Sequence, residues 1–341
     1  MPWYDLPLAK LREHTAGSAE PPGLDDWWAA RLAGARAAAS PATLTEYEPG
    51  SYGPLRVYDA EFSGAGGDRI RGWYLLPPGS PAPAAAMDGL PGSGPAGDGP
   101  AAVVVKFVGY GGGRGLPVEH ALLPAAGFAT FVMDVRGQGG RWTVGATGDP
   151  AAGAGPELST VMTRGLARPE DYYYTRLFTD AARAVETAAG LAGPGARIAV
   201  SGASQGGGLA LATAALLGDA VAVCHADVPF LCDIGRAVTL APKAPYTEVA
   251  EFLANHTGLV DTALNTLCYV DCALLASRIT AECLLSVGLM DDICPPSTVF
   301  AAYNAIRSGK DIAVHPFGVH VVPGSHTERQ LAHLRQHLTA G

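Results

Sequence analysis

The sequence predicts an α/β fold: a mostly parallel sheet of eight strands with helices on both faces, in a single domain over residues 1–341. Two observations lead to this prediction. Residues 55–62 and 70–76 have the pattern of strands and flank a Gly-rich turn, so the sheet begins with an antiparallel hairpin. After residue 100, β-branched runs alternate with helical patterns, which is typical of parallel sheets. The strands expected there are 102–108, 128–134, 197–202, 220–226, 282–288 and 312–317.

Helices are expected between and after these strands, at 118–126, 171–190, 296–307 and 326–338, and three further segments differ from this pattern. Residues 1–40 carry apolar residues at helical spacing around a Pro-Pro turn, which predicts an N-terminal helical arm packed on the main body. Residues 79–100 are rich in Pro, Gly and Ala, so we expect a flexible insertion loop. Residues 231–279 have helical spacing and no strand pattern, which predicts a helical cap inserted over the active face.

The composition describes a globular chain that does not bind nucleic acid. Of its 341 residues, 48% are hydrophobic and 16% are charged, which is enough for a large core. The net charge of −9 opposes binding to phosphate backbones, and no basic stripe counteracts it. No apolar run approaches a membrane span, and the first residues lack the regions of a signal peptide. We therefore expect a cytoplasmic protein with neither nucleic acid nor membrane as a partner.

The run Gly202-Ala203-Ser204-Gln205-Gly206 lies between a β-branched strand and an Ala/Leu-rich helix. A Gly-x-Ser-x-Gly between a strand and a helix is typical of a nucleophile elbow, a strained turn that lifts the serine hydroxyl above the sheet. Gly202 and Gly206 provide the room that two closely approaching backbones need. The sequence therefore predicts Ser204 as a catalytic nucleophile.

A serine hydroxyl needs a base to remove its proton and an acid to orient that base. On sheets of this kind the order along the chain is serine, acid, histidine. Asp291 and Asp292 both follow strand 282–288, and the pattern does not choose between them; Asp227, after strand 220–226, is a rival. His320 follows the last strand and is the predicted base. Structural roles are expected for the other histidines. His315 should pack inside the last strand, and His326, His333 and His337 on the last helix could form a surface metal pair at most.

Acyl transfer also needs donors for the oxyanion that forms on the attacked carbonyl. The backbone N–H of Gln205 is one candidate, and Tyr110 in the Gly-rich loop 109–115 is the second. A phosphate cradle is an alternative for that loop, but no Gly-x-Gly-x-x-Gly is in register with the strand end, which disfavours a nucleotide site. Six cysteines lack paired Cys-x-x-Cys spacing, so we expect buried thiols and no metal site.

Six ordered motifs together resemble the acetyl xylan esterase and cephalosporin C deacetylase family, carbohydrate esterase family seven. The resemblance extends from the first residues to the last helix, with residues 79–100 as the main interruption. The motifs are Gly109-Tyr110-x-Gly-Gly-Arg114-Gly115, Asp134-Val-Arg136-Gly137-Gln138-Gly139, Tyr172-Tyr-Tyr-x-Arg176-x-Phe178-Thr179-Asp180, Gly202-x-Ser204-Gln205-Gly206-Gly207, Asp227-Val-Pro229-Phe230-Leu231 and Gly288-Leu-Met-Asp291-x-x-x-Pro295-Pro296-Ser297-Thr298.

The resemblance implies an α/β-hydrolase fold, removal of acetyl groups from sugars and from cephalosporin C, no cofactor, and a homohexamer. It implies Ser204 as the nucleophile and the amides of Tyr110 and Gln205 as the oxyanion donors. It also implies Asp291 as the acid, since His320 follows it by 29 positions as in the family. Arg136 is expected to tie loops beneath the site. The family has Gly-His-Glu at the base, whereas this chain has Val319-His320-Val321.

These residues predict a two-step transfer in which an acetyl group passes through Ser204 to water. The small acyl pocket is expected to be walled by Pro229, Phe230 and Cys294, although core burial is an equal alternative for them. Two other functions remain open at this stage. The same fold also suits a lipase or a peptidase, and a binding protein that keeps the fold without catalysis is a further alternative.

Overall fold

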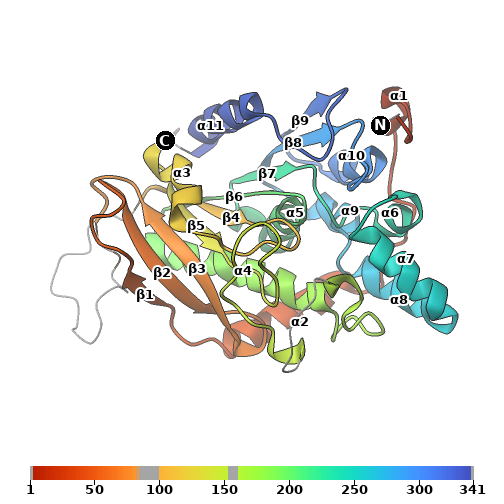
Figure 1. The fold of residues 1–341 in the computed structure, drawn as a ribbon, viewed down its shortest axis with the longest axis horizontal. Coiled ribbons are helices and arrows are strands. Elements are labelled where there is room, and N and C mark those ends of the chain that lie inside the picture. Colours follow the sequence, from red (N-terminus) through yellow and green to blue (C-terminus); the bar gives the residue numbers. More distant parts are fainter. Residues whose placement is uncertain (1–2, 82, 84–99, 153–159, 339–341) are drawn as a thin grey trace.

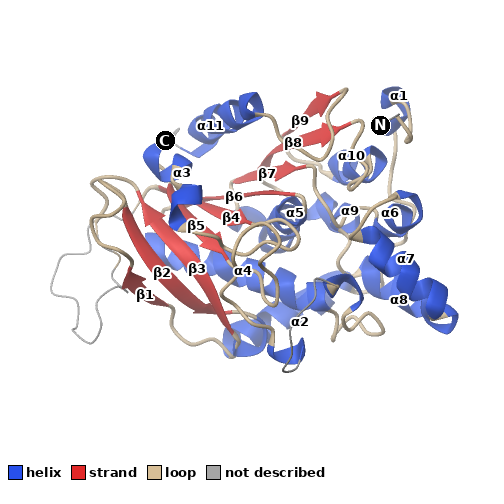
Figure 2. Cartoon of the chain, viewed as in Figure 1, coloured by secondary structure: helices blue, strands red, loops and turns tan. Residues whose placement is uncertain are grey.

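The structure is a computed structural model that describes residues 3–81, 83, 100–152 and 160–338. One large twisted sheet runs through the molecule, with helices on both of its faces (Figure 1, Figure 2). Its strand order is β1-β2-β3-β5-β4-β6-β7-β8-β9. The strands are β1 Thr43–Glu46, β2 Arg56–Ser63, β3 Arg69–Leu76, β4 Ala102–Phe107, β5 Ala129–Met133, β6 Arg197–Ala203, β7 Val223–Asp227, β8 Glu282–Gly288 and β9 Lys310–His315.

The sheet confirms the predicted mixed architecture, but it has nine strands where eight were expected. The missed strand is β1, whose four residues, Thr-Leu-Thr-Glu, include one buried side chain, Leu44. So short a polar edge strand has no recognisable periodicity, and it is held by antiparallel pairing with β2. The strands β1, β2, β3 and β5 pair antiparallel, and from β5 through β4 to β9 every pairing is parallel.

Alternate residues of β4 pack into two separate apolar layers, one on each face of the sheet. Val103 and Val105 belong to the large core that includes α4 and α5, whereas Val104 belongs to a smaller cluster with Leu334 and Leu338 of α11. This is the two-residue alternation of a strand buried on both sides. The helices of these layers are α3 Leu122–Ala125, α4 Tyr173–Ala192, α5 Gln205–Leu217, α10 Pro296–Ala305 and α11 Gly324–Leu338.

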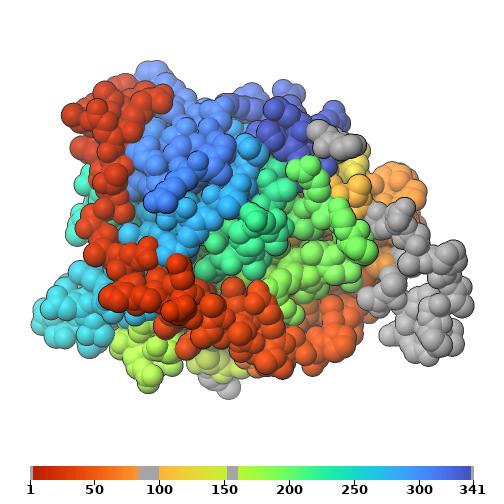
Figure 3. Space-filling model, turned by 180° about the vertical axis from the view of Figure 1, so that it is seen from behind, coloured from red at the N-terminus to blue at the C-terminus, as the bar shows by residue number. Residues whose placement is uncertain are grey.

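The N-terminal segment contains two helices, α1 Leu8–Leu11 and α2 Leu24–Ala37, and packs along later parts of the chain. Figure 3 shows it as a strip lying across the surface of the other segments. The Trp28 ring stacks on Phe178 at 5.9 Å, and its indole N–H donates to the Tyr269 carbonyl at 2.9 Å. The insertion loop predicted at 79–100 lies largely outside the described residues.

The segment between β7 and β8 is helical, as its spacing predicts, and its described residues form no strand. Figure 2 shows α6, α7 and α8 beyond the arrowheads of β7 and β8. One stretch, Thr257–Arg278, is long and apolar enough for a membrane span by length and composition, which the sequence analysis did not anticipate. Its most apolar part is half buried inside the fold, and core helices pass the same test. The helices are α6 Ile234–Leu240, α7 Tyr246–Asn255, α8 Val260–Cys268 and α9 Cys272–Leu275.

Candidate active site

Ser204 stands on a strained turn between β6 and α5. Its backbone has φ 57° and ψ −122°, a region that residues with a side chain adopt rarely and at a cost. Two hydrogen bonds hold the turn: the Ser204 N–H donates to the Asp227 carbonyl at 2.9 Å, and the Phe230 N–H donates to the Ser204 carbonyl at 2.9 Å. The end of β7 and the residues after it therefore fix the elbow that the sequence predicts.

The glycines around Ser204 are required by close backbone contacts. A Cβ on Gly202 would lie 2.4 Å from the Gly206 carbonyl carbon, and a Cβ on Gly206 would lie 2.3 Å from the Phe107 carbonyl oxygen. Both distances are far below van der Waals contact. The glycines thus let α5 begin directly above β4 and β6, which places Ser204 at the carboxyl edge of the sheet.

Asp291 and His320 form a hydrogen-bonded pair. The Asp291 side chain is fully buried, and its Oδ2 lies 2.8 Å from His320 Nδ1. Its other oxygen, Oδ1, accepts from the N–H groups of Ile293 and Cys294, both at 2.9 Å. A carboxylate held in this way orients the imidazole and leaves Nε2 to act as a base. Asp292 faces elsewhere and pairs with Lys243 at 2.7 Å.

The Ser204 hydroxyl lies beside the Cys294 thiol rather than on the imidazole. Burial and the Asp291 charge raise the pKa of Cys294 well above its ordinary value, and a hydrogen bond with the Ser204 side chain opposes that rise. Between Ser204 and His320, both of them described residues, the structure contains no hydrogen bond. Catalytic hydrogen bonds are often formed only when substrate is bound, so the base role of His320 toward Ser204 stays a prediction.

The two predicted oxyanion donors lie on adjacent elements. Gln205 is the first residue of α5, so its N–H has no acceptor within the helix. Tyr110 follows β4, which pairs with β6 just before the elbow. The Tyr110 hydroxyl donates to the Glu248 carboxylate of α7, at 2.9 Å to Oε1 and 2.8 Å to Oε2. Glu248 therefore connects the helical segment after β7 to the loop that carries Tyr110, a contact the sequence analysis missed.

Gln138 connects the two elements that carry the predicted oxyanion donors. Its Oε1 accepts from the Gly111 N–H at 2.7 Å, and its Nε2 donates to Gln205 Oε1 at 2.9 Å. Gln205 Oε1 also accepts from the Tyr174 hydroxyl at 3.0 Å. The sequence analysis noted Gln138 only as part of a motif and did not predict this bridge. Its position in the Arg136-Gly137-Gln138 motif was the one feature of the sequence that could have indicated a role for Gln138 near the site.

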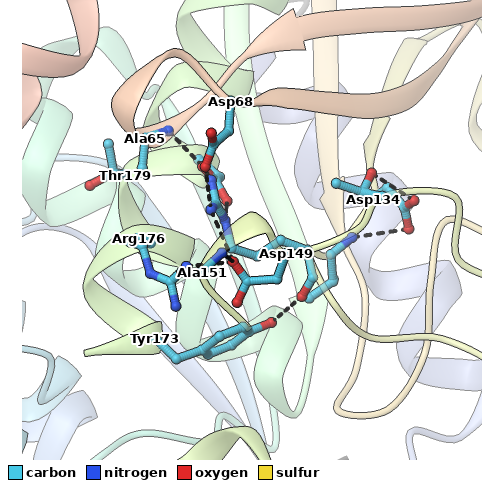
Figure 4. A network of polar contacts seen from close by, with 12 residues as sticks. Ala65, Asp68, Asp134, Asp149, Ala151, Tyr173, Arg176 and Thr179 are labelled. Carbon is cyan, nitrogen blue, oxygen red and sulfur yellow. Dashed lines mark hydrogen bonds and ion pairs between the residues drawn. The ribbon is translucent and has the colours of Figure 1, made fainter. Parts of the chain in front are cut away.

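Arg136 confirms the expectation that its guanidinium ties segments together beneath the site. It donates to both oxygens of Asp180 in α4, at 2.5 and 2.8 Å, and to Asp68 at 2.9 Å. Asp149 lies 3.5 Å away and also pairs with Arg164 and Arg176. Figure 4 shows Asp68, Asp149 and Arg176 gathered in this network.

Burial would raise the pKa of Asp149, but hydrogen bonds and charge from Arg176, with help from Arg164 and Arg136, lower it below its ordinary range. The Asp149 carboxylate is therefore held ionised in the folded chain. Between its folded and unfolded pKa values the unfolded chain binds more protons, so this contribution to stability is present at neutral pH and is lost as the pH falls through the folded value.

Asp227, the rival acid, is engaged by other groups. Its Oδ1 accepts from Ser286 Oγ at 2.7 Å and lies 2.8 Å from His326 Nε2, and its Oδ2 accepts from Gln330 at 2.8 Å. The surface position expected for His326 is wrong, because this side chain is buried against the carboxylate. His333 pairs instead with the buried His225, at 3.1 Å. Within the described ranges, no group of three or more His, Cys, Asp or Glu side chains could hold a metal ion.

The three predicted pocket walls are all buried. Phe230 packs between Tyr246 and Tyr110, with ring centroids at 4.4 and 6.3 Å, which agrees with the core burial held as an equal alternative in the sequence analysis. For Cys294, which interacts with the Ser204 side chain, a role as a pocket wall stays a prediction. All six cysteines are free, and five of them are buried, in accordance with the predicted thiols; Cys268 is partly exposed.

A mixed sheet of this order with a strained serine elbow and a buried carboxylate–histidine pair defines an α/β-hydrolase. Comparisons with known proteins agree and are more specific. The chain belongs to the acetyl xylan esterase family: the family model described as Acetyl xylan esterase (AXE1) matches residues 1–338. The members of that family are acetyl ester hydrolases.

Two solved structures are similar over nearly the whole chain. The acetyl xylan esterase from Paenibacillus sp. R4 is 31% identical with a TM-score of 0.85, covering 97% of this chain and 100% of that one. Acetyl xylan esterase 1 from Thermoanaerobacterium sp. JW/SL YS485 is 32% identical with a TM-score of 0.81, covering 97% and 99%. The acetyl esterase Axe7A of Xylanibacter ruminicola is 30% identical over 161 residues, 47% of this chain and 35% of that protein. The matched part is thus about a third of that relative's length.

Proposed function

We propose that this chain is a serine esterase that removes acetyl groups from acetylated xylo-oligosaccharides and from cephalosporin C. The observation that carries the proposal is the 2.8 Å pairing of His320 with a fully buried Asp291, in a chain whose Ser204 stands on a strained elbow. Membership in the acetyl xylan esterase family supports acetyl as the acyl group. The proposed catalytic residues are Ser204, His320 and Asp291.

The proposed reaction has two acyl-transfer steps. His320 Nε2 takes the proton of Ser204 while Oγ attacks the acetyl carbonyl, and the N–H groups of Tyr110 and Gln205 bind the oxyanion. The tetrahedral intermediate collapses, the C–O bond to the sugar breaks, and the sugar alcohol leaves with the proton from His320. Water, deprotonated by the same imidazole, then attacks the acetyl-enzyme and releases acetate.

Selectivity for small acyl groups would follow from the buried surroundings of Ser204. The buried Cys294, whose thiol interacts with the Ser204 hydroxyl, supports the proposal of a small acyl pocket. One extra methylene in such a pocket changes the transition-state energy by about 1–3 kcal/mol. Propionyl esters should therefore react more slowly than acetyl esters without being excluded.

Two further features belong to this proposal. We expect a homohexamer, on the resemblance of the six motifs to carbohydrate esterase family seven, and its check is a solution mass of six 34.9 kDa chains by light scattering. We also expect cytoplasmic residence, which fractionation of the source cells would test. Neither expectation affects the chemistry of Ser204.

The decisive experiment compares the wild-type chain with Ser204→Ala. The wild-type chain should release acetate from acetylated xylotriose and from cephalosporin C, and a fluorophosphonate probe should label it. Ser204→Ala should lose both labelling and turnover. Wild-type protein that is folded but is neither labelled nor active would favour a binding protein on the same fold. Faster cleavage of a dipeptide amide than of any acetyl ester would favour a peptidase.

A further inference from the structure

The loop that follows Gln138 presents one large aromatic side chain to solvent. Trp142 is 76% exposed, although its indole N–H donates to the Tyr110 carbonyl at 3.1 Å. Tyr110 is the residue whose N–H is the proposed oxyanion donor, so the indole is hydrogen-bonded to the residue that would hold the ester carbonyl. Its polar edge is engaged, while the hydrocarbon surface of the ring is left to solvent.

The backbone around Trp142 is firmly attached to the loop that carries Tyr110. The Gly113 N–H donates to the Thr143 carbonyl at 3.2 Å, and the Gly115 N–H donates to the Val144 carbonyl at 2.9 Å. The two loops approach so closely that a Cβ on Gly113 would lie 2.2 Å from the Gly145 Cα. Trp142 is therefore an exposed ring on a well-braced loop, which reduces the entropy lost when a ligand packs on it.

Other exposed aromatic residues differ from Trp142 in their surroundings. Trp3 and Phe317 pack on each other with centroids 6.2 Å apart, so each covers part of the other. Among the described residues, no second aromatic ring packs on Trp142. Val144, 58% exposed, is a second exposed apolar side chain on the same loop. Burying such a surface against a ligand is favourable, and the position beside Tyr110 makes the substrate the natural ligand.

We propose that Trp142 is a sugar-binding platform at the rim of the active site, on which a pyranose ring of the substrate packs its C–H face. This inference rests on the proposed esterase function and deepens it, because it assigns the residue that recognises the alcohol part of the ester. The negative face of an indole ring attracts the weakly positive C–H groups of a sugar. Specificity for a sugar ester over a simple alkyl ester would then come from Trp142, whereas Ser204, His320 and Asp291 act equally on both.

The test compares Trp142→Ala and Trp142→Phe on two substrates, acetylated xylotriose and ethyl acetate, the second of which has no ring. Trp142→Ala should raise KM for acetylated xylotriose about tenfold, which corresponds to about 1.4 kcal/mol. Trp142→Phe keeps an aromatic face and should stay within about threefold of wild type. On ethyl acetate the two variants should behave alike, within about twofold of each other, because both lose the bond to the Tyr110 carbonyl and this ester has no ring to pack on residue 142. Leu122→Ala, which removes an exposed apolar side chain on α3, is the matched control and should change neither substrate.

A second measurement separates binding from turnover. In the Ser204→Ala background, calorimetry with unacetylated xylotriose should give a dissociation constant that rises about tenfold on adding Trp142→Ala and changes little on adding Trp142→Phe. Unchanged KM and unchanged binding in Trp142→Ala would overturn the proposal. A loss on ethyl acetate in Trp142→Ala as large as its loss on acetylated xylotriose would also overturn the proposal, since the indole would then act only by holding Tyr110. If wild type cleaves ethyl acetate but not acetylated xylotriose, the proposed sugar substrate is wrong, and the role of Trp142 in binding it is then wrong as well.

Discussion

The Arg136 network allows a quantitative prediction about stability. Arg136 and Asp180 are both fully buried and share two hydrogen bonds, at 2.5 and 2.8 Å. Replacing Arg136 with Met leaves the Asp180 carboxylate buried with the Ala65 N–H, 2.8 Å away, as its remaining partner in the network. Breaking a buried pair from one side costs about 3–5 kcal/mol, because the other charge stays uncompensated. Arg136→Met should therefore lower the free energy of unfolding by about that amount.

The double variant Arg136→Met/Asp180→Leu separates a lost attraction from a stranded charge. Removing both charges leaves an apolar pair and leaves the Ala65 N–H without its acceptor, which costs about 1–3 kcal/mol. Asp68, which is partly exposed, loses its bond to Arg136 in the single and the double variant alike. Asp149 keeps Arg164 and Arg176, so it is not stranded. The double variant should thus be more stable than Arg136→Met alone, although it carries one substitution more.

Thermal unfolding at a fixed scan rate measures this difference. For a chain of this size about 2 °C corresponds to 1 kcal/mol, so Arg136→Met should melt about 6–10 °C below wild type and the double variant between the two. Arg36→Met, which removes a partly exposed partner of Glu186, is the control and should shift Tm by about 2 °C or less. The reasoning would be refuted if Arg136→Met melted at the wild-type temperature, or if the double variant melted at a lower temperature than Arg136→Met.

Three further predictions concern the site and its surroundings. Asp291→Asn should lower kcat about 10⁴-fold with little change in KM, because an amide no longer stabilises the charged imidazole, and steady-state kinetics on ethyl acetate would show it. Glu248→Ala removes both bonds from the Tyr110 hydroxyl to residue 248 and should lower kcat about tenfold on the same ester, whereas Glu248→Gln, which keeps an acceptor, should stay within about threefold; equal effects would contradict a positioning role. Burial and the His333 charge lower the pKa of His225 from 6.5 to about 3, so the unfolded chain takes up a proton that the folded chain refuses. Stability should fall below pH 6.5 by up to about 1.4 kcal/mol per pH unit, and the urea midpoint of His225→Gln should depend less on pH; an unchanged slope would contradict this.

The parts of the fold that follow from local pattern were predictable from the sequence. The elbow at Ser204 and the parallel strands are encoded in contiguous residues, since a β-branched run, a glycine and an apolar helix each show their own periodicity. Strand β1 was not predictable in this way, because its four residues acquire strand geometry only through pairing with β2. The end of β9 shifted for a similar reason: at an edge the ladder, rather than the residue pattern, decides where a strand stops.

The side-chain contacts around the site were less accessible. Glu248 and Tyr110 are 138 residues apart, and neither motif nor spacing relates them. Trp142 is an exposed residue in a loop, where sequence patterns carry little information about contacts. Asp291 and Asp292 are chemically equivalent in the sequence, and only the turn after β8 directs one carboxylate to His320 and the other to Lys243. Hydrophobic periodicity reports burial, whereas partner choice depends on long-range packing.

Val321 occupies the position where the family has the glutamate of Gly-His-Glu, and its surroundings can be compared with those of the buried Asp291. The Val321 side chain is 63% exposed, and its backbone N–H donates to the Val319 carbonyl at 2.8 Å. The imidazole of His320 takes its orientation from the buried Asp291, whose own carbonyl accepts from the Tyr4 hydroxyl at 2.6 Å. A carboxylate at position 321 would therefore extend from a surface position, while the group that orients the base is supplied from inside the fold. The absence of the glutamate leaves the acid–base pair intact, and Val321 instead adds to the apolar surface beside His320.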